Sequence, residues 1–298
     1  MVINVPDTFN IFGITIGLYG IVFDCAYITA LVITMIRAKR KKLDTDFIMG
    51  IFINSIVFGV LGAKMLYIIS VGRSMIMYTF WEKLISPNGF VAYGGIILGI
   101  LSNFLWCIIK KKDFYEYFDI VMPSVAAAQA VGRLGCLLNG CCYGFVDTDM
   151  HWYNVMYTRS VTVYNNMPYI PIQLVASLGD LLICIILIML SNKFKTKGYT
   201  ASMYLILYGI GRFIIEFYRA DPRGNVGPLS TSQFISIIML AIAIPQFIYC
   251  KNREKIKVAI KNKIDNINKN RERLKRARAR QKEKELKMKR RRNKKHGK

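Results

Sequence analysis

The chain contains little histidine and few acidic residues. Only two of its 298 residues are His, at positions 151 and 296, and the spacing of Cys136, Cys141 and Cys142 does not follow the usual pattern of zinc ligands. We therefore expect no metal and no cofactor. We interpret these cysteines as small packing residues, with a reversible thiol role as the alternative. The seven cysteines imply no disulfide framework, because most are scattered through apolar stretches.

The N-terminus lacks the basic stretch with which a signal peptide begins. Asp7 precedes an apolar run that continues directly into further membrane-like sequence. We therefore expect no cleaved signal peptide, and we expect the first apolar run to stay in the mature protein.

Long apolar stretches dominate most of the chain. Hydrophobic residues make up 53% of it, aromatic residues 12%, and the mean hydropathy is +0.31, which is typical of a bilayer protein and excludes a disordered one. The formal net charge is +24, but residues 251–298 contain 23 of the 42 Lys and Arg and only five of the 18 Asp and Glu. The sequence predicts an apolar domain of residues 1–250 and a basic tail of residues 251–298. The charge gives no reason to expect nucleic-acid binding by the domain.

Seven apolar stretches are long enough to cross about 30 Å of hydrocarbon. They lie near residues 12–36, 47–70, 89–109, 119–141, 172–191, 200–219 and 232–250. Basic loops alternate with loops poor in Lys and Arg, so the positive-inside rule places the N-terminus outside and the C-terminus in the cytoplasm. The predicted fold class is an all-α, polytopic integral membrane helical bundle with seven transmembrane helices. In the alternative, six helices cross and the fourth stretch, interrupted by Pro123 and several glycines, is re-entrant.

Ionisable residues inside these stretches are costly and need a reason. Arg133 lies in the fourth stretch, and Arg212, Glu216 and Arg219 in the sixth share one face of a helix. Glu216 can orient one arginine while other guanidinium groups face a ligand, and arginine binds phosphate in bidentate geometry. The predicted topology places this stripe in the outer half of the membrane, where lipid phosphate is the most available anion. In the alternative, the charges form ion pairs that only hold the bundle together.

The segment around Arg133 is too polar for a plain membrane span. It runs GRLGCLLNGCCYG. Its glycines let backbone N–H groups approach a ligand, and Asn139 supplies a neutral donor and acceptor.

Three sequence blocks resemble the prolipoprotein diacylglyceryl transferases, which are bacterial inner-membrane enzymes. GRLGCLLNGCCYG resembles the family signature G-R-x-G-N-F-x-N-x-E-x-x-G and keeps Gly132, Arg133, Gly135, Asn139 and Gly144. RFIIEFYR, residues 212–219, resembles R-F-x-x-E-x-x-R, and the LSTSQFIS that follows is similar to L-(S/T)-x-(G/S)-Q-x-x-S. GFVAYGG, residues 89–95, resembles a block that ends in H-G-G. The resemblance covers roughly residues 10–250.

The chain departs from the family pattern at several positions. Tyr93 stands where many members have His, Cys136 replaces the signature Asn, Cys141 replaces its Glu, and Lys64 replaces an Arg. This pattern fits a divergent member with altered proton handling, or a relative with another acceptor. Tyr93 is the positional candidate for the base, but a phenol with a pKa near 10 is a poor one, and the identity of the base stays open.

The resemblance implies a multi-pass enzyme of the bacterial cytoplasmic membrane. It would transfer the diacylglyceryl group of phosphatidylglycerol to the lipobox cysteine of a prolipoprotein. Arg133 and Arg212 would stabilise charge on the leaving phosphate, and Tyr93 is the third catalytic candidate. The expected substrate-binding residues are Arg133, Asn139, Glu216, Arg219, Gly94 and Gly95. A transporter or lipid-binding membrane protein that uses the same arginines without chemistry is the alternative.

The basic tail has a pattern of its own. Ile256, Ile260, Ile264 and Ile267 form a helical stripe flanked by lysines, which predicts a helix in the membrane interface. Most residues after Arg271 are charged, so we expect a disordered arm that is attracted to anionic lipids of the cytoplasmic leaflet. RNA or ribosome binding by this arm is the rival hypothesis.

Overall fold

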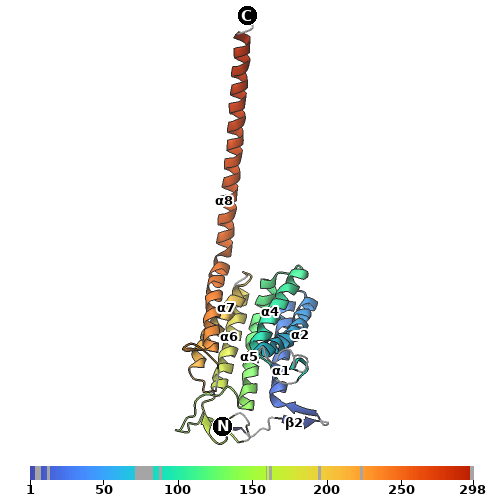
Figure 1. Cartoon of the computed structure of the whole chain (residues 1–298), viewed down its shortest axis with the longest axis vertical. Coiled ribbons are helices and arrows are strands. Elements are labelled where there is room, and N and C mark those ends of the chain that lie inside the picture. The colour runs from blue at the N-terminus through green and yellow to red at the C-terminus, as the bar shows by residue number, and fades with distance from the viewer. Residues whose placement is uncertain are drawn as a thin grey trace. The chain divides into compact units, whose positions relative to one another are not determined.

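A computed structural model describes residues 1–3, 8–11, 14–70, 83–86, 89–158, 160, 163–193, 196–221 and 224–295. The chain divides into two compact units, Met1–Phe247 and Ile248–Lys298. The first unit is mainly helical (Figure 1), and it contains every position predicted to belong to the site.

Six helices in the described residues are long and apolar enough to cross a membrane. They are α1 (Leu18–Arg40), α2 (Thr45–Ser70), α4 (Ala92–Ile109), α5 (Phe114–Asn139), α6 (Ile172–Lys193) and the segment Thr231–Asn252 of α8 (Thr231–Lys295). Helix α7 (Tyr199–Glu216) has 18 residues but is not among the six, and it carries Arg212 and Glu216. The helical membrane architecture is thus confirmed, whereas the seventh span and the orientation stay predictions.

Helix α5 is continuous, although the sequence suggested an interruption. The carboxylate of Asp113 accepts hydrogen bonds from the backbone N–H groups of Tyr115 and Glu116 and so caps the first turn. Pro123 lies inside the helix without ending it. The helix ends at Gly140, whose φ of 67° is the left-handed conformation that glycine adopts without steric cost.

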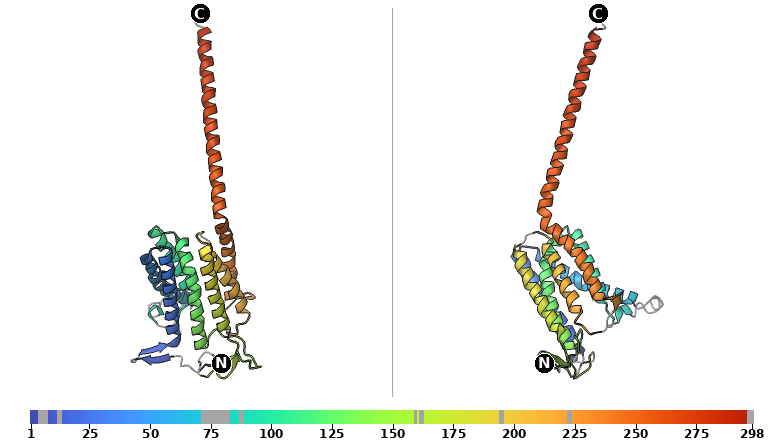
Figure 2. Two further views of the ribbon diagram at one scale, coloured as in Figure 1. Left: turned by 180° about the vertical axis from the view of Figure 1, so that it is seen from behind. Right: turned by 90° about the vertical axis from the view of Figure 1, so that its left-hand side faces the viewer.

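The helices pack in pairs, with α1 against α5, α5 against α6, and α2 against α4 (Figure 2). Small residues permit the closest of these contacts. A Cβ atom on Gly94 would lie 2.2 Å from the carbonyl oxygen of Gly62, and one on Gly95 would lie 2.7 Å from that of Gly59. These glycines therefore form the packing seam between α2 and α4.

A buried polar cluster fixes one end of the bundle. Asp119 on α5 accepts hydrogen bonds from the backbone N–H groups of Gly198 at 2.7 Å and Ala201 at 2.8 Å, which caps the first turn of α7. Arg37 on α1 donates to the carbonyl oxygen of Ile120 at 3.1 Å and to Ser191 at 3.2 Å. Helices α1, α5, α6 and α7 are thus tied together at this end.

Short strands lie at the other end of the bundle, where α5 ends and α6 begins. Parallel pairing of β1 (Val2–Ile3) with β4 (Val155–Tyr157) and antiparallel pairing of β4 with β5 (Pro168–Tyr169) form a three-stranded sheet. Two hairpins consist of β2 (Thr8–Ile11) with β3 (Ile14–Gly17) and β6 (Asn225–Val226) with β7 (Leu229–Ser230). The all-α prediction missed these strands because segments of two to four residues carry almost no periodic signal.

The second unit consists of the later part of α8. The sequence predicted a disordered arm after Arg271, but the structure is helical to Lys295. Lys, Arg, Glu, Gln, Leu and Ala are good helix formers, and residues 251–295 contain neither Gly nor Pro. Local helix propensity therefore accounts for the difference.

Candidate functional site

Arg212 and Glu216 lie one turn apart on α7 and form a buried ion pair. The Nη2 atom of Arg212 is 2.8 Å from the Oε2 atom of Glu216, and it also donates to the hydroxyl of Ser232 on α8 at 2.7 Å. The Nη1 atom of Arg212 is buried and has no hydrogen-bond partner in the described part of the chain. A buried guanidinium N–H without a partner is costly, so this group is suited to an anionic ligand.

Arg133 faces a carboxylate that the sequence analysis missed. Its Nε atom lies 4.0 Å from Oδ2 of Asp180 on α6, and the Asp180 side chain is 9% exposed. At that distance the carboxylate balances charge without occupying the hydrogen-bond donors of the guanidinium. The available signal was an aspartate inside the apolar stretch 172–191, the same kind of signal that identified Arg133.

Tyr208 on α7 lies within electrostatic range of both arginines. Its phenol interacts electrostatically with Arg133, Asp180, Arg212 and Tyr93. The structure thus brings three predicted catalytic residues, from α4, α5 and α7, around one tyrosine. Sequence analysis did not identify Tyr208, because a tyrosine in an apolar helix has no distinguishing pattern.

Arg219 is engaged within the protein. Its Nε and Nη2 atoms pair with the two carboxylate oxygens of Asp221 at 2.9 and 3.0 Å, and its side chain is 3% exposed. Burial raises the pKa of Asp221, and the charge of Arg219 opposes that rise. Arg219 also pairs through its backbone with Gly144, which places it beside the segment that follows α5. Its expected contact with a lipid head group stays a prediction.

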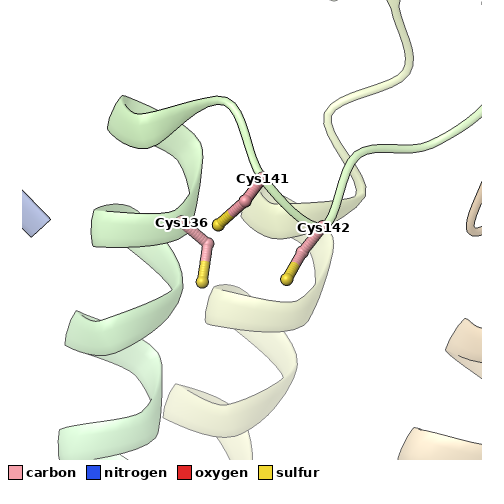
Figure 3. A group of neighbouring side chains, drawn as sticks. All are labelled: Cys136, Cys141 and Cys142. Atoms are coloured by element: carbon pink, nitrogen blue, oxygen red, sulfur yellow. The ribbon is translucent and has the colours of Figure 1, made fainter. Parts of the chain in front are cut away.

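Asn139 is the last residue of α5. Three thiols lie close together at this end of the helix (Figure 3). The Sγ atoms of Cys136, Cys141 and Cys142 all lie within 4.8 Å of one another. The Asn139 side chain hydrogen-bonds with the Cys141 thiol, and Arg219 and Arg133 act electrostatically on the Cys142 sulfur. In the described residues, no other group of His, Cys, Asp and Glu side chains is placed to hold a metal ion.

The segment that carries these thiols is fixed by its neighbours. Gln173, which is buried at the start of α6, donates to the carbonyl oxygen of Cys141 at 2.9 Å, and Tyr157 on β4 donates to that of Leu137 at 2.9 Å. A Cβ atom on Gly144 would lie 2.7 Å from the carbonyl oxygen of Ile170, so only glycine fits there. The predicted importance of Gly144 thus has a packing reason.

Tyr93, Gly94 and Gly95 lie at the start of α4. Tyr93 is 36% exposed and lies close enough to Tyr208 to interact with it electrostatically. Gly94 and Gly95 contact α2, and the structure gives them a packing role. Binding of substrate by these two glycines stays a prediction.

The site thus contains two arginines from different helices, Arg133 on α5 and Arg212 on α7. Both arginines have a carboxylate partner, which orients them, and one keeps a buried donor for a ligand. Such preorganised cations stabilise negative charge that develops on a phosphate oxygen.

Comparisons with known proteins identify the family of the chain. The sequence model of the prolipoprotein diacylglyceryl transferase family matches residues 6–249. A phosphatidylglycerol–prolipoprotein diacylglyceryl transferase of Clostridium tetani is 41% identical over 239 residues, which cover 80% of this chain and 95% of that protein. One of Clostridium perfringens is 39% identical over 78% of this chain and 90% of its own length, and one of Finegoldia magna is 33% identical over 82% and 95%. The chain therefore belongs to the prolipoprotein diacylglyceryl transferase family.

Proposed function

We propose that the protein transfers the diacylglyceryl group of phosphatidylglycerol to the lipobox cysteine thiol of prolipoproteins. The thiol sulfur attacks the glyceryl carbon, the bond from this carbon to the phosphate oxygen breaks, and glycerol phosphate leaves. The products are a thioether-linked lipid and a proton from the acceptor thiol. Membership of the family and the names of the relatives support this activity.

One observation in the site carries the proposal. Arg212 has a buried Nη1 donor with no partner among the described residues, while its Nη2 atom is held by Glu216 and Ser232. A phosphate oxygen fills this need, and its negative charge grows as the leaving group departs. Stabilisation that is larger in the transition state than in the ground state accelerates the reaction.

The remaining site residues have supporting roles in this proposal. Arg133 binds the second side of the phosphate, with Asp180 as its counter-charge. Glu216 orients Arg212, Asn139 binds glycerol or phosphate oxygens, and Arg219 guides the head group. Tyr93 stays the candidate for the proton step on the acceptor thiol.

Membrane placement completes the proposal. Helix α7 serves as a seventh span beside the six apolar ones, with the N-terminus outside and the C-terminus in the cytoplasm of a bacterial cell. Residues 1–250 form the catalytic membrane domain, and the basic tail of residues 251–298 binds anionic lipids of the inner leaflet.

Purified protein tests the activity directly. Phosphatidylglycerol labelled in its head-group glycerol is mixed with a lipobox peptide, and both released glycerol phosphate and peptide lipidation are measured. We expect equal amounts of the two products. A peptide with Ser in place of the acceptor Cys is the control, and head-group release without peptide lipidation would contradict transfer to the thiol. Binding of the lipid with no release at all would favour the transporter or lipid-binding alternative.

A further inference from the structure

The three thiols of Cys136, Cys141 and Cys142 have no role in the phosphate chemistry described above, yet they lie together beside it. Cys136 belongs to the last turn of α5, and the other two follow that helix directly (Figure 3). The distance between any two of their sulfur atoms is at most 4.8 Å. A packing role alone would not require the sulfur atoms of three cysteines to lie this close together.

The backbone fixes this convergence. The N–H group of Cys141 donates to the carbonyl oxygen of Cys136 at 3.1 Å across the left-handed Gly140, which is the pattern of a Schellman motif. Cys142 has a φ of 62°, a left-handed conformation that costs a residue other than glycine about 1 kcal/mol. Two left-handed residues within three positions reverse the chain and bring Cys142 back toward Cys136. The segment therefore keeps a strained turn that holds the third thiol near the first two.

Three thiols in this geometry match a known class of ligand. Zinc binds cysteine sulfur at about 2.3 Å, and tetrahedral coordination at that length separates neighbouring sulfurs by about 3.8 Å. The sulfur atoms are at most 4.8 Å apart. Side-chain movements of about 1 Å would bring them to the separation that zinc requires. Arg133 and Arg219 act on Cys142 electrostatically and offset the excess negative charge of three thiolates around a divalent cation.

Three protein ligands leave one tetrahedral position open. Catalytic zinc sites have this arrangement, whereas structural sites use four protein ligands. The open position would lie beside Asn139, which contacts Cys141, and beside the arginines that act on Cys142. The acceptor substrate in the proposed function is itself a thiol, which is a preferred fourth ligand for such an ion.

We propose that Cys136, Cys141 and Cys142 bind one thiophilic divalent cation of the zinc type, whose fourth position takes the acceptor cysteine of the substrate. The inference rests on the proposed function. On binding, the acceptor S–H loses its proton to water, since a coordinated thiol is deprotonated. Its sulfur then forms the bond to the glyceryl carbon, and the electron pair of the breaking carbon–oxygen bond leaves on glycerol phosphate. The cation thereby supplies the activation that a base would otherwise provide, and Tyr93 need not act as that base.

Metal binding by the purified full-length protein tests the site without relying on activity. We expect one Zn²⁺ per chain after desalting, and Co²⁺ in its place should give a sulfur-to-cobalt charge-transfer band. Cys136→Ser and Cys142→Ser should each lose the band, whereas Cys184→Ser, a buried cysteine of α6 outside the cluster, should keep it. The proposal would be overturned if the wild-type protein bound no stoichiometric metal. A disulfide between two of these cysteines in protein purified with a reducing agent would also overturn it.

Substrate peptides test the open position. A lipobox peptide should intensify the cobalt band, because a fourth sulfur joins the ion, and the matched Ser peptide should leave it unchanged. An identical response to both peptides would overturn the assignment of the fourth position. Removal of the metal by a chelator should lower transfer at least about tenfold, with recovery on addition of Zn²⁺. Full transfer by metal-free protein would overturn the inference and leave the proposed function intact, whereas bound metal with no transfer in any preparation would count against the proposed function instead.

Discussion

Arg133 on α5 and Arg212 on α7 both act on the same residue, Tyr208, and each has its own carboxylate partner, Asp180 for the first and Glu216 for the second. Two oriented cations are therefore presented to one region from separate helices. In the proposed function these two groups bind one lipid phosphate, because each of its oxygens can accept a charge-assisted hydrogen bond.

Removal of either guanidinium should abolish transfer without preventing insertion. We expect Arg133→Ala and Arg212→Ala to lower the rate of transfer by about a hundredfold or more, because each removes a stabilising donor from the transition state. Arg212→Lys should recover little, since the three N–H groups of an ammonium share one nitrogen and cannot replace the separate Nη1 and Nη2 positions of the guanidinium. Lys39→Ala, at an exposed position near the end of α1, is the control. An alanine variant with more than about a tenth of wild-type activity would contradict the assigned role.

Substitutions of Tyr93 separate a chemical role from a packing role. If the phenol takes part in the proton step, Tyr93→Phe should lower turnover strongly, and Tyr93→His should retain or raise it. The pH dependence of transfer is measured for each variant. Equal rates for wild type and Tyr93→Phe would show that activation of the acceptor thiol comes from elsewhere, as a metal at the three cysteines would provide.

The glycine seam between α2 and α4 should tolerate no side chain. A Cβ atom at Gly94 would meet the Gly62 carbonyl at 2.2 Å, so Gly94→Ala must separate the helices, and we expect a loss of roughly 1–3 kcal/mol in the free energy of unfolding. Gly99→Ala on the same helix meets nothing within 4 Å and serves as the matched control. Thermal unfolding in detergent measures both. Equal stability of the two variants would show that the seam is looser than the structure indicates.

The orientation of the bundle can be tested by labelling. In a background without native cysteines, an impermeant thiol reagent added from outside should modify a cysteine at Asn165 but not one at Asn192. Both positions are exposed, Asn165 in the connection between β4 and β5 and Asn192 at the end of α6. Modification of Asn192→Cys from outside would overturn the seven-span topology.

The basic tail should be dispensable for catalysis but should bind membranes. Truncation after Cys250 should leave transfer largely intact, because the site residues lie in the unit Met1–Phe247. A peptide of residues 251–298 should bind vesicles that contain anionic lipid and lose most of that binding in high salt, since the attraction is electrostatic. Neutral vesicles are the control. Equal binding to neutral and anionic vesicles would contradict the electrostatic explanation.

Sequence patterns predicted the six apolar helices and singled out the arginines for the same physical reason, and the roles of these arginines stay predictions. Apolar runs of about 20 residues identify membrane helices, and charges within them stand out, as Arg133 and Arg212 do. Asp180 gives the same signal, because it is an aspartate inside the apolar stretch 172–191.

The thiol group shows what a linear sequence hides. Cys136 is five residues from Cys141, and only the left-handed conformations of Gly140 and Cys142 turn the chain so that the sulfurs meet. No propensity predicts a left-handed cysteine. The strands at this end escaped prediction in a similar way, because β1 and β4 lie more than 150 residues apart and local periodicity gives no signal of such a pairing.

The hydrogen bond from Gly198 to Asp119 also sets the depth of the site. Helices α5 and α7 run in the same direction from this contact, Arg133 follows Asp119 by 14 residues, and Arg212 follows Gly198 by 14 residues. At about 1.5 Å per residue, both guanidinium-bearing positions lie about 21 Å from the shared starting level. The two arginines thus lie at about the same distance along their helices from the Asp119 carboxylate. Loss of the Asp119 carboxylate would remove both backbone hydrogen bonds that hold the start of α7 against α5 at this level.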